Sequence, residues 1–330
     1  MKILYAIQGT GNGHMSRAQV FIPLLKQYGN VDILISSHDH DITLSHPVKF
    51  RINGLGFTFG KNGGINYWKS FWRFKLIRFF IDMYQFPLND YDVVINDFEP
   101  LTAWLCKLKK KKIVSLSHHS SYQSKLAPRP IKTDWFNEKV LKYHSPCNAY
   151  YSFHFKSYDA NIFTPIIRDE ITNAIVKNNG NILVYLPSYS SENLIPLFEK
   201  IQNKRFDIFC KHTSKNFAVK NIDVHCISEK EYINKLLNCE GVICNAGFET
   251  PAEAMYLGKK LLCVPMKGQY EQQCNAAALK QLGVLIVDKL DSNFDGIVKN
   301  WLLNSNIVQE KYPNQNQEII DKVIAEFKLK

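Results

Sequence analysis

Short apolar runs alternate with helical patterns along almost the whole chain, and this alternation constrains the fold more than any other feature. In the first half we expect strands at about 2–7, 31–35, 92–96 and 112–116 and helices at about 15–28, 66–84 and 100–108. In the second half we expect strands near 181–186, 206–210, 222–226, 241–244, 260–264 and 284–287 and helices near 191–202, 229–238, 251–257, 270–282 and 293–304. Strands rich in Val, Ile and Leu that alternate with helices require right-handed crossovers and a parallel sheet.

The sequence therefore predicts an α/β chain with two Rossmann-like domains, each built on a doubly wound parallel sheet. We expect the junction near "IFTPIIRDEI" at 162–171, which gives domains of 1–166 and 167–330. A chain of 330 residues is long enough to bury two cores of ordinary size. In such sheets ligands bind at the carboxyl ends of the strands, so two facing domains would form one cleft.

The composition is that of a globular protein, with 45% hydrophobic and 22% charged residues. No apolar run reaches the roughly 18 residues that a membrane span needs, and the first residues lack the pattern of a secretory signal. We therefore expect a cytoplasmic protein. The eight cysteines show no C-x-x-C spacing, which favours reduced, buried thiols over a structural zinc site.

The glycine-rich turn "GTGNGHMSRA" at 9–18 follows the first expected strand. A dinucleotide-binding turn needs G-x-G-x-x-G, but here His14 stands where the third glycine belongs, and the second strand ends in serines instead of an acid. A nicotinamide-dependent dehydrogenase is therefore disfavoured. At a helix start the dipole disfavours imidazolium, so His14 is either a neutral general base or only a cap of the turn. Gly11 and Gly13 would let a ligand approach the backbone closely.

The second informative stretch runs from "NAGFETPAEAMYLG" to "GQYEQQCNAAALKQLGV", over 245–284. Thr250 reads as a helix N-cap, Pro251 as the first helical residue and Glu253 as the acid of a capping box. A helix start facing the cleft would bind a diphosphate, and Gly247 would leave room for it.

Together these two stretches resemble the paired signatures of the MurG-type nucleotide-sugar glycosyltransferases, which have the GT-B fold. The resemblance implies that Glu253 binds the donor ribose and that Glu271 and Gln272 contact the transferred sugar. It implies that Asn275 supports the helix and that the glycine turn faces the donor phosphates, with His14 as the base.

The resemblance also implies weaker assignments in the second domain. Ser188 and Ser190 in "YLPSYSSE" would replace the serines and glycines that contact the diphosphate, and main-chain groups of Ile227 would hold the nucleotide base, so the donor is expected to be a UDP-sugar. A last helix at about 314–330 could pack back on the N-terminal domain.

The sequence leaves the roles of several first-domain side chains undecided. Asp97 and Glu99, in "NDFEP", could orient His14, act as the base themselves or only cap the next helix. His118 or His119, in "SHHS", could contact phosphate or acceptor.

The basic charge lies in the first half. Residues 1–166 carry 21 Lys and Arg against 11 Asp and Glu, whereas residues 167–330 carry 20 against 19. The segment "NYWKSFWRFKLIRFF" at 66–80 has the aromatic and basic mixture found at lipid headgroups, so an anionic membrane surface is an expected partner. No RNA-binding motif accompanies it, and we expect no nucleic-acid partner.

The sequence predicts neither a cofactor nor an essential metal. "DHD" at 39–41 and "DYD" at 90–92 match the short D-x-D metal pattern, but neither stands where such a site needs it. We expect an inverting hexosyltransferase that moves a sugar to a hydroxyl acceptor, with a lipid-linked or cell-envelope glycan as the candidate acceptor. The alternatives are a nucleotide-sugar 2-epimerase of the same fold and a non-catalytic nucleotide-sugar-binding protein.

Overall fold

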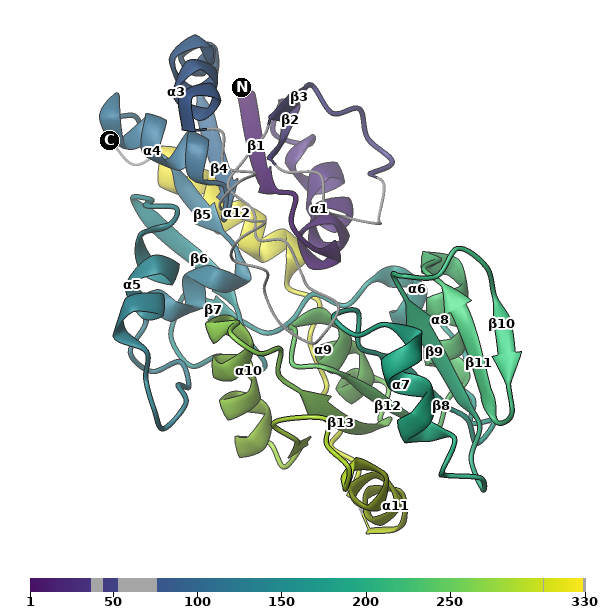
Figure 1. Ribbon diagram of the computed structural model, residues 1–330. Coiled ribbons are helices and arrows are strands. Elements are labelled where there is room, and N and C mark those ends of the chain that lie inside the picture. Colours follow the sequence, from purple (N-terminus) through teal and green to yellow (C-terminus); the bar gives the residue numbers. More distant parts are fainter. Residues whose placement is uncertain (37–43, 53–75, 305, 329–330) are drawn as a thin grey trace.

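The computed structural model describes residues 1–36, 44–52, 76–304 and 306–328, which form two α/β lobes (Figure 1). The sheet of the first lobe has the order β3-β2-β1-β4-β5-β6-β7, and its neighbouring strands are parallel. Its strands are β1 (Lys2–Gln8), β2 (Asn30–Ser36), β3 (Phe50–Ile52), β4 (Val93–Asp97), β5 (Val114–Leu116), β6 (Ala149–Phe153) and β7 (Ile162–Phe163).

The sheet of the second lobe has the order β10-β11-β9-β8-β12-β13-β14. Only the β10–β11 pair is antiparallel among the strand pairs within the described residues. The strands are β8 (Ile182–Tyr185), β9 (Phe206–Cys210), β10 (Phe217–Val219), β11 (Ile222–Cys226), β12 (Gly241–Asn245), β13 (Lys260–Val264) and β14 (Leu285–Ile286). The prediction of two doubly wound parallel sheets is confirmed.

In each sheet the strand order reverses at one place, between β1 and β4 in the first lobe and between β8 and β12 in the second. The chain leaves β1 and β8 toward one side of the sheet and leaves β4 and β12 toward the other. Loops therefore part at these points and leave a crevice, where open α/β sheets bind their ligands.

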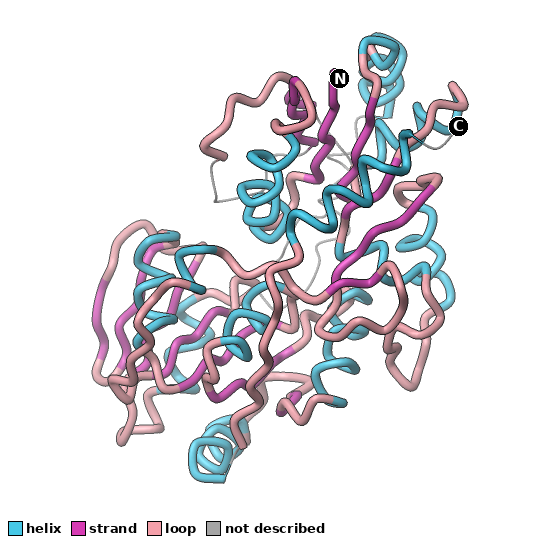
Figure 2. Tube along the Cα trace, turned by 180° about the vertical axis from the view of Figure 1, so that it is seen from behind, coloured by secondary structure: helices cyan, strands magenta, loops and turns pink. Residues whose placement is uncertain are grey.

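Helices cover both faces of each sheet (Figure 2). In β1, Ile3, Tyr5 and Ile7 belong to one buried cluster, and Leu4 and Ala6 belong to another on the opposite face. The helices are α1 (Asn12–Leu25), α3 (Leu76–Gln85), η1 (Leu88–Asp90), α4 (Pro100–Leu108), η2 (His118–Gln123), α5 (Trp135–Tyr143), α6 (Asp169–Thr172), α7 (Ser191–Phe198), α8 (Glu229–Asn238), α9 (Glu249–Tyr256), α10 (Tyr270–Gln281), α11 (Phe294–Asn304) and α12 (Asn316–Lys328).

The last helix, α12, leaves the second lobe and packs on the first, beside α1, β5 and β6. Its apolar side chains Ile319, Ile320, Val323 and Ile324 are buried. At its end Tyr151 donates a hydrogen bond to Glu326 Oε1 at 3.0 Å. The chain therefore crosses between the lobes twice, once after β7 and once before α12.

Two predicted segments fall wholly or partly outside the described residues. Of the helix expected at 66–84, the structure describes only the part within α3, and the D-x-D pattern at 39–41 lies in the segment 37–43. The second D-x-D pattern is at the amino end of β4, where Asp92 accepts a hydrogen bond from the Lys2 backbone N–H at 2.8 Å. Among the described residues, no helix is both long enough and apolar enough to span a membrane.

Candidate active site in the cleft between the lobes

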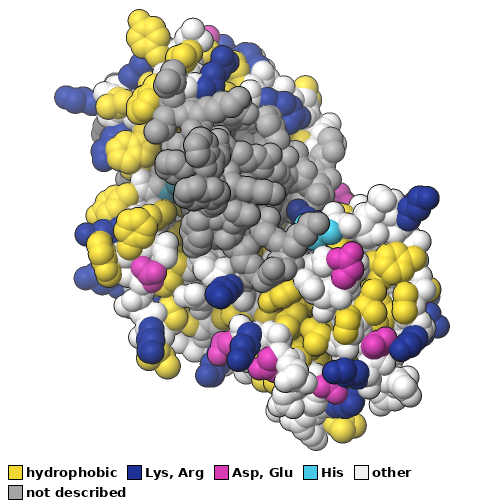
Figure 3. Space-filling view, viewed as in Figure 1, with side chains coloured by type: hydrophobic (Ala, Val, Ile, Leu, Met, Phe, Trp, Pro, Cys, Tyr) yellow, Lys and Arg dark blue, Asp and Glu magenta, His cyan; other side chains and the backbone are white. Residues whose placement is uncertain are grey.

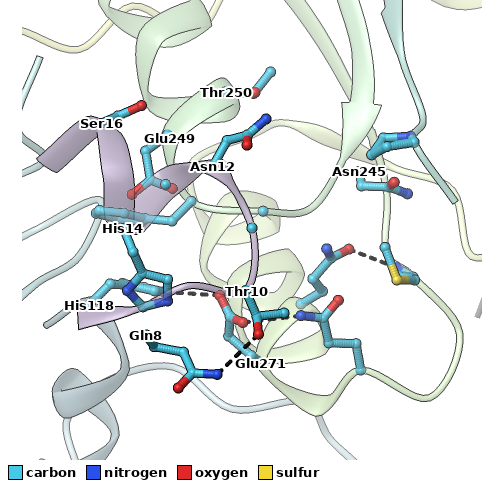
Figure 4. A pocket seen from close by; sticks show the side chains of 18 of the residues that line it. Gln8, Thr10, Asn12, His14, Ser16, His118, Asn245, Glu249, Thr250 and Glu271 are labelled. Atoms are coloured by element: carbon cyan, nitrogen blue, oxygen red, sulfur yellow. Dashed lines mark hydrogen bonds and ion pairs between the residues drawn. The ribbon is translucent and has the colours of Figure 1, made fainter. Parts of the chain in front are cut away.

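The loops at the carboxyl ends of both sheets enclose one cavity of about 410 Å³. The residues that line it include most of the predicted site residues: Gly11, Gly13, His14, His118, His119, Ser188, Ile227, Gly247, Thr250, Glu253, Glu271 and Gln272. Figure 4 shows His14 from the first lobe close to Glu271 from the second, and both residues line the cavity. Asp97 and Glu99 are not among the residues that line the cavity.

His14 stands in the first turn of α1, and only 8% of its side chain is exposed. Its Nδ1 lies 2.9 Å from Oδ1 of Asp97, the last residue of β4. Although burial opposes it, the charges of Arg17 and His14 hold the pKa of Asp97 well below its usual range, so this carboxyl is ionised. An ionised carboxylate only accepts, so a neutral His14 that donates to it would have its proton on Nδ1 and its lone pair on Nε2. Nη2 of Arg17 lies 3.1 Å from the same Nδ1.

Glu99 lies two residues beyond Asp97 but has a different environment. Its Oε1 accepts from the Leu101 N–H at 2.8 Å, and its Oε2 accepts from the Thr102 N–H at 2.7 Å, so it caps α4. Phe98 between them has φ 59°, a left-handed conformation that turns the two carboxylates in different directions. Glu99 as base or as partner of His14 does not fit this geometry, because its side chain is fully buried in the cap.

The two neighbouring histidines of η2 contact the second lobe. His119 stacks on His14 with ring centroids 5.3 Å apart, and its Nε2 lies 3.1 Å from Oε2 of Glu271. His118 donates from Nδ1 to the Phe153 carbonyl at 2.7 Å, and its Nε2 lies 3.0 Å from Oδ1 of Asn275. Burial lowers the pKa of His118 to about 3. Both histidines line the cavity, but only His119 has a ring nitrogen, Nδ1, without a hydrogen-bond partner among the described residues.

Two residues of α10, Glu271 and Asn275, contact this histidine pair, and a third, Gln272, lines the cavity. Burial opposes ionisation of Glu271, but the charge of His119 outweighs it and lowers the pKa of Glu271 well below its usual range. Gln272 accepts from the Met266 N–H at 2.8 Å, which fixes its side chain at the cavity wall. Asn275 donates from Nδ2 to the Ala246 carbonyl at 3.1 Å and so ties α10 to the loop after β12.

The helix that follows β12 starts earlier than predicted. The predicted N-cap at Thr250 is wrong, because α9 begins at Glu249 and Phe248 takes the cap position without a side-chain cap. Pro251 is therefore the third helical residue, and Glu253 does not close a capping box. The amides of the first turn of α9 lack a side-chain cap and border the cavity, together with Gly247, where a Cβ would meet no atom within 4 Å.

Glu253 is buried and paired. Its Oε1 accepts from Nε of Arg168 at 2.8 Å, and Arg168 also contacts Glu229 Oε1 from Nη1 at 2.9 Å. Burial raises the pKa of Glu253, and the charge of Arg168 counteracts that rise. Thr250 Oγ1 accepts a hydrogen bond from the Tyr232 hydroxyl at 3.2 Å.

Sequence reasoning missed several residues of this cavity. Arg17 lies three positions after His14, so the helical spacing alone could have placed it on the same face of α1. Glu249, Arg168, Phe98 and His144 come from separate elements, and no local pattern marks them. Among the described residues, no group of three or more His, Cys, Asp or Glu side chains is arranged to hold a metal ion.

Comparisons with known proteins agree with this architecture. The sequence matches the profile described as Glycosyl transferase family 1 over residues 1–304. MurG of Acinetobacter baumannii superposes with a TM-score of 0.58 at 15% identity, over 98% of this chain and 99% of that one.

Arabidopsis thaliana UGT89C1 superposes with a TM-score of 0.62 in its complex with quercetin and 0.61 in its complex with UDP-L-rhamnose, each at 14% identity over 99% of both chains. At these identities the structural likeness establishes the fold alone. No curated protein matches the sequence significantly.

Proposed function

The chain belongs to glycosyl transferase family 1 and is a glycosyltransferase of GT-B fold, and from this premise we propose that it moves a sugar from a UDP-sugar to a hydroxyl acceptor with inversion. The observation that carries the proposal is that His14, paired with Asp97, lines one cavity together with Glu253, Glu271 and Gln272 of the other lobe. UDP and UDP-L-rhamnose are bound in solved UGT89C1 complexes, which supports the donor class.

We assign the donor to the second lobe. The diphosphate would accept from the amides at the start of α9, with Gly247 and Ser188 beside it. Glu253 would accept hydrogen bonds from the ribose hydroxyls. Glu271 would accept hydrogen bonds from the hydroxyls of the transferred sugar, and Gln272 would donate to them or accept from them. A carboxylate offers about four lone-pair positions, so the existing bonds to Arg168 and His119 leave capacity for a ligand. Main-chain groups of Ile227 would hold the uracil.

In the proposed reaction, His14 Nε2 takes the proton of the acceptor hydroxyl as its oxygen attacks the anomeric carbon. The bond between this carbon and the β-phosphate oxygen breaks on the opposite side, and UDP leaves with the electron pair. Asp97 stabilises the imidazolium through the Nδ1 hydrogen bond. The proposal includes no cofactor and no essential metal, because helix amides and hydroxyls can stabilise the leaving diphosphate.

The acceptor would enter beside α5, whose residues Asn137, Val140 and Leu141 line the first-lobe side of the cavity. Quercetin is bound in a UGT89C1 complex, so this fold accepts small hydroxylated molecules. We keep a lipid-linked or cell-envelope glycan as the proposed acceptor and place the enzyme at the cytoplasmic face of a membrane. Figure 3 has Lys and Arg side chains among exposed apolar ones along the outer edge of the first lobe, in support of this contact. The segment 66–80 that we propose for it lies mostly outside the described residues, although Phe80 is exposed.

The first test is a thermal-shift screen of nucleotide sugars, because a ligand that binds only the folded state raises its melting temperature. We expect UDP and one or a few UDP-sugars to raise it. If only nicotinamide dinucleotides or no nucleotide raised it, the proposed donor class would be wrong.

The second test separates the roles of the lobes. We expect His14→Ala to lower turnover by about 100-fold or more with little change in UDP affinity, because the base contacts the acceptor. Glu253→Ala should mainly weaken UDP binding in calorimetry. His46→Ala, a first-lobe histidine outside the cavity, is the control and should leave both unchanged. Loss of UDP binding in His14→Ala with turnover retained would contradict the assignment.

A further inference from the structure

Arg17 connects the two lobes at the centre of the site. It lies on α1, one turn beyond His14, and its side chain is 4% exposed. Its Nη2 donates to both oxygens of Asp97, at 3.1 Å to Oδ2 and 3.2 Å to Oδ1. Its Nη1 donates to Oε1 of Glu249, the first residue of α9. One guanidinium thus holds a carboxylate from each lobe.

The chain makes room for this contact at Gly13. A Cβ on Gly13 would overlap the carboxylate of Glu249, so the absent side chain is what lets Glu249 reach across the cleft. The start of α1 has neither a side-chain cap nor an acidic residue of its own. The carboxylate of Glu249 therefore lies over the start of one helix while its backbone belongs to the start of another.

Glu249 is a problem for the proposed donor site unless its charge is offset. It borders the cavity beside Gly247 and Thr250, where the diphosphate would bind. A free carboxylate there would repel a diphosphate, and the low dielectric of a closed cleft would strengthen the repulsion. Arg17 is the cation paired with it, and 24% of the Glu249 side chain remains exposed.

We propose that Arg17 is a positioning residue that pairs with Glu249 and holds its carboxylate away from the donor, so that a nucleoside diphosphate binds at the start of α9 more tightly while the lobes are together. This inference rests on the proposed donor site. Because Arg17 comes from the first lobe and Glu249 from the second, the pair links the affinity for the nucleotide to the closure of the cleft.

The test is UDP binding by calorimetry in four forms of the full chain. We expect Arg17→Gln to weaken UDP binding about tenfold, because Glu249 is left uncompensated. We expect Glu249→Gln to bind UDP about threefold more tightly than the unmodified protein, and the double variant to return to within about threefold of it. Glu199→Gln, which removes a carboxylate paired with exposed Lys220, is the matched control and should change nothing.

Rescue by the second substitution is the decisive readout, since a merely structural role of Arg17 would not be restored by removing Glu249. A double variant as weak as Arg17→Gln overturns the proposal. Arg17→Gln also leaves Asp97 buried without its cation. If that variant does not fold, Glu249→Gln decides alone, and equal or weaker UDP binding in Glu249→Gln overturns the proposal. If the unmodified protein fails to bind UDP, the proposed donor class has failed instead.

Discussion

At the scale of single residues, Asp97 and Glu99 lie two positions apart at the end of β4 and yet have different environments. Both carboxylates follow the same buried strand, so the sequence predicted a place near the cleft for each and left their roles open. The left-handed Phe98 separates them, one toward His14 and one into the cap of α4. Backbone conformation at a non-glycine residue has no reliable sequence signal, which explains why the roles stayed undecided.

Contacts between residues of different lobes were also not predictable from the sequence. His14, Glu253 and Glu271 were found because each stands in a recognisable stretch at a strand end. Arg17 and Glu249 stand in the same two stretches but were missed, because their role depends on a contact between residues 232 positions apart in sequence.

Buried neutral histidines predict a loss of stability in mild acid. Burial lowers the pKa of His118 to about 3 and that of His154 well below its usual value, whereas the unfolded chain protonates histidine near pH 6.5. The unfolded state therefore binds more protons below that pH, and the free energy of unfolding falls as pH decreases from about 6.5 toward 3.

Urea unfolding at pH 8, 7, 6 and 5 checks this expectation, with little change between pH 8 and 7 and a decline below. His154→Asn keeps an acceptor for the Phe155 N–H and should reduce the decline by up to about 1.4 kcal/mol per pH unit. An identical slope in both proteins would show that His154 does not carry the effect.

At the scale of elements, long periodic segments were predictable, whereas several short ones were missed. The predicted strand 241–244 and helix 229–238 match β12 and α8. β3 has three residues and β7 has two, which is too few to show the alternating pattern of a strand. They form because a neighbouring strand supplies backbone hydrogen-bond partners. α5 has no fully buried residue, so its pattern lacks the apolar stripe that marks a helix.

Because Glu99 caps α4, we expect its substitution to lower the stability of the protein but not its turnover. Glu99→Ala should lower the free energy of unfolding by about 1–2 kcal/mol, because two buried N–H groups lose their acceptor. The turnover of the folded protein should remain unchanged. Asp134→Ala removes the N-cap of exposed α5 and should cost less, since water replaces the carboxylate there. If Glu99→Ala lost turnover without a loss of stability, Glu99 would have a role in the reaction.

At the scale of the whole molecule, the order of the strands explains why the site residues of both lobes line the same cleft. Both reversal points, β1/β4 and β8/β12, face it, and each contributes a glycine-containing loop and a helix start. The alternation of strands and helices was enough to predict this arrangement. The sequence did not determine which loops touch, because lobe orientation depends on packing between distant segments.

The packing of α12 predicts that the first lobe depends on the end of the chain. Ile320 is fully buried, and Ile320→Ala should lower the free energy of unfolding by about 2–4 kcal/mol in urea titrations. Lys322→Ala, on the exposed face of the same helix, should stay within about 0.5 kcal/mol. Equal effects of the two substitutions would mean that α12 does not stabilise the lobe.

Two covalent tethers between the lobes also restrict how they can part. A body held at a single point can swivel freely, whereas one held at two separate points rotates chiefly about the line that joins them. Opening of the cleft to admit a donor would then be a rotation about one axis. The ion pair between Arg17 and Glu249 would form again between the same atoms each time the cleft closes.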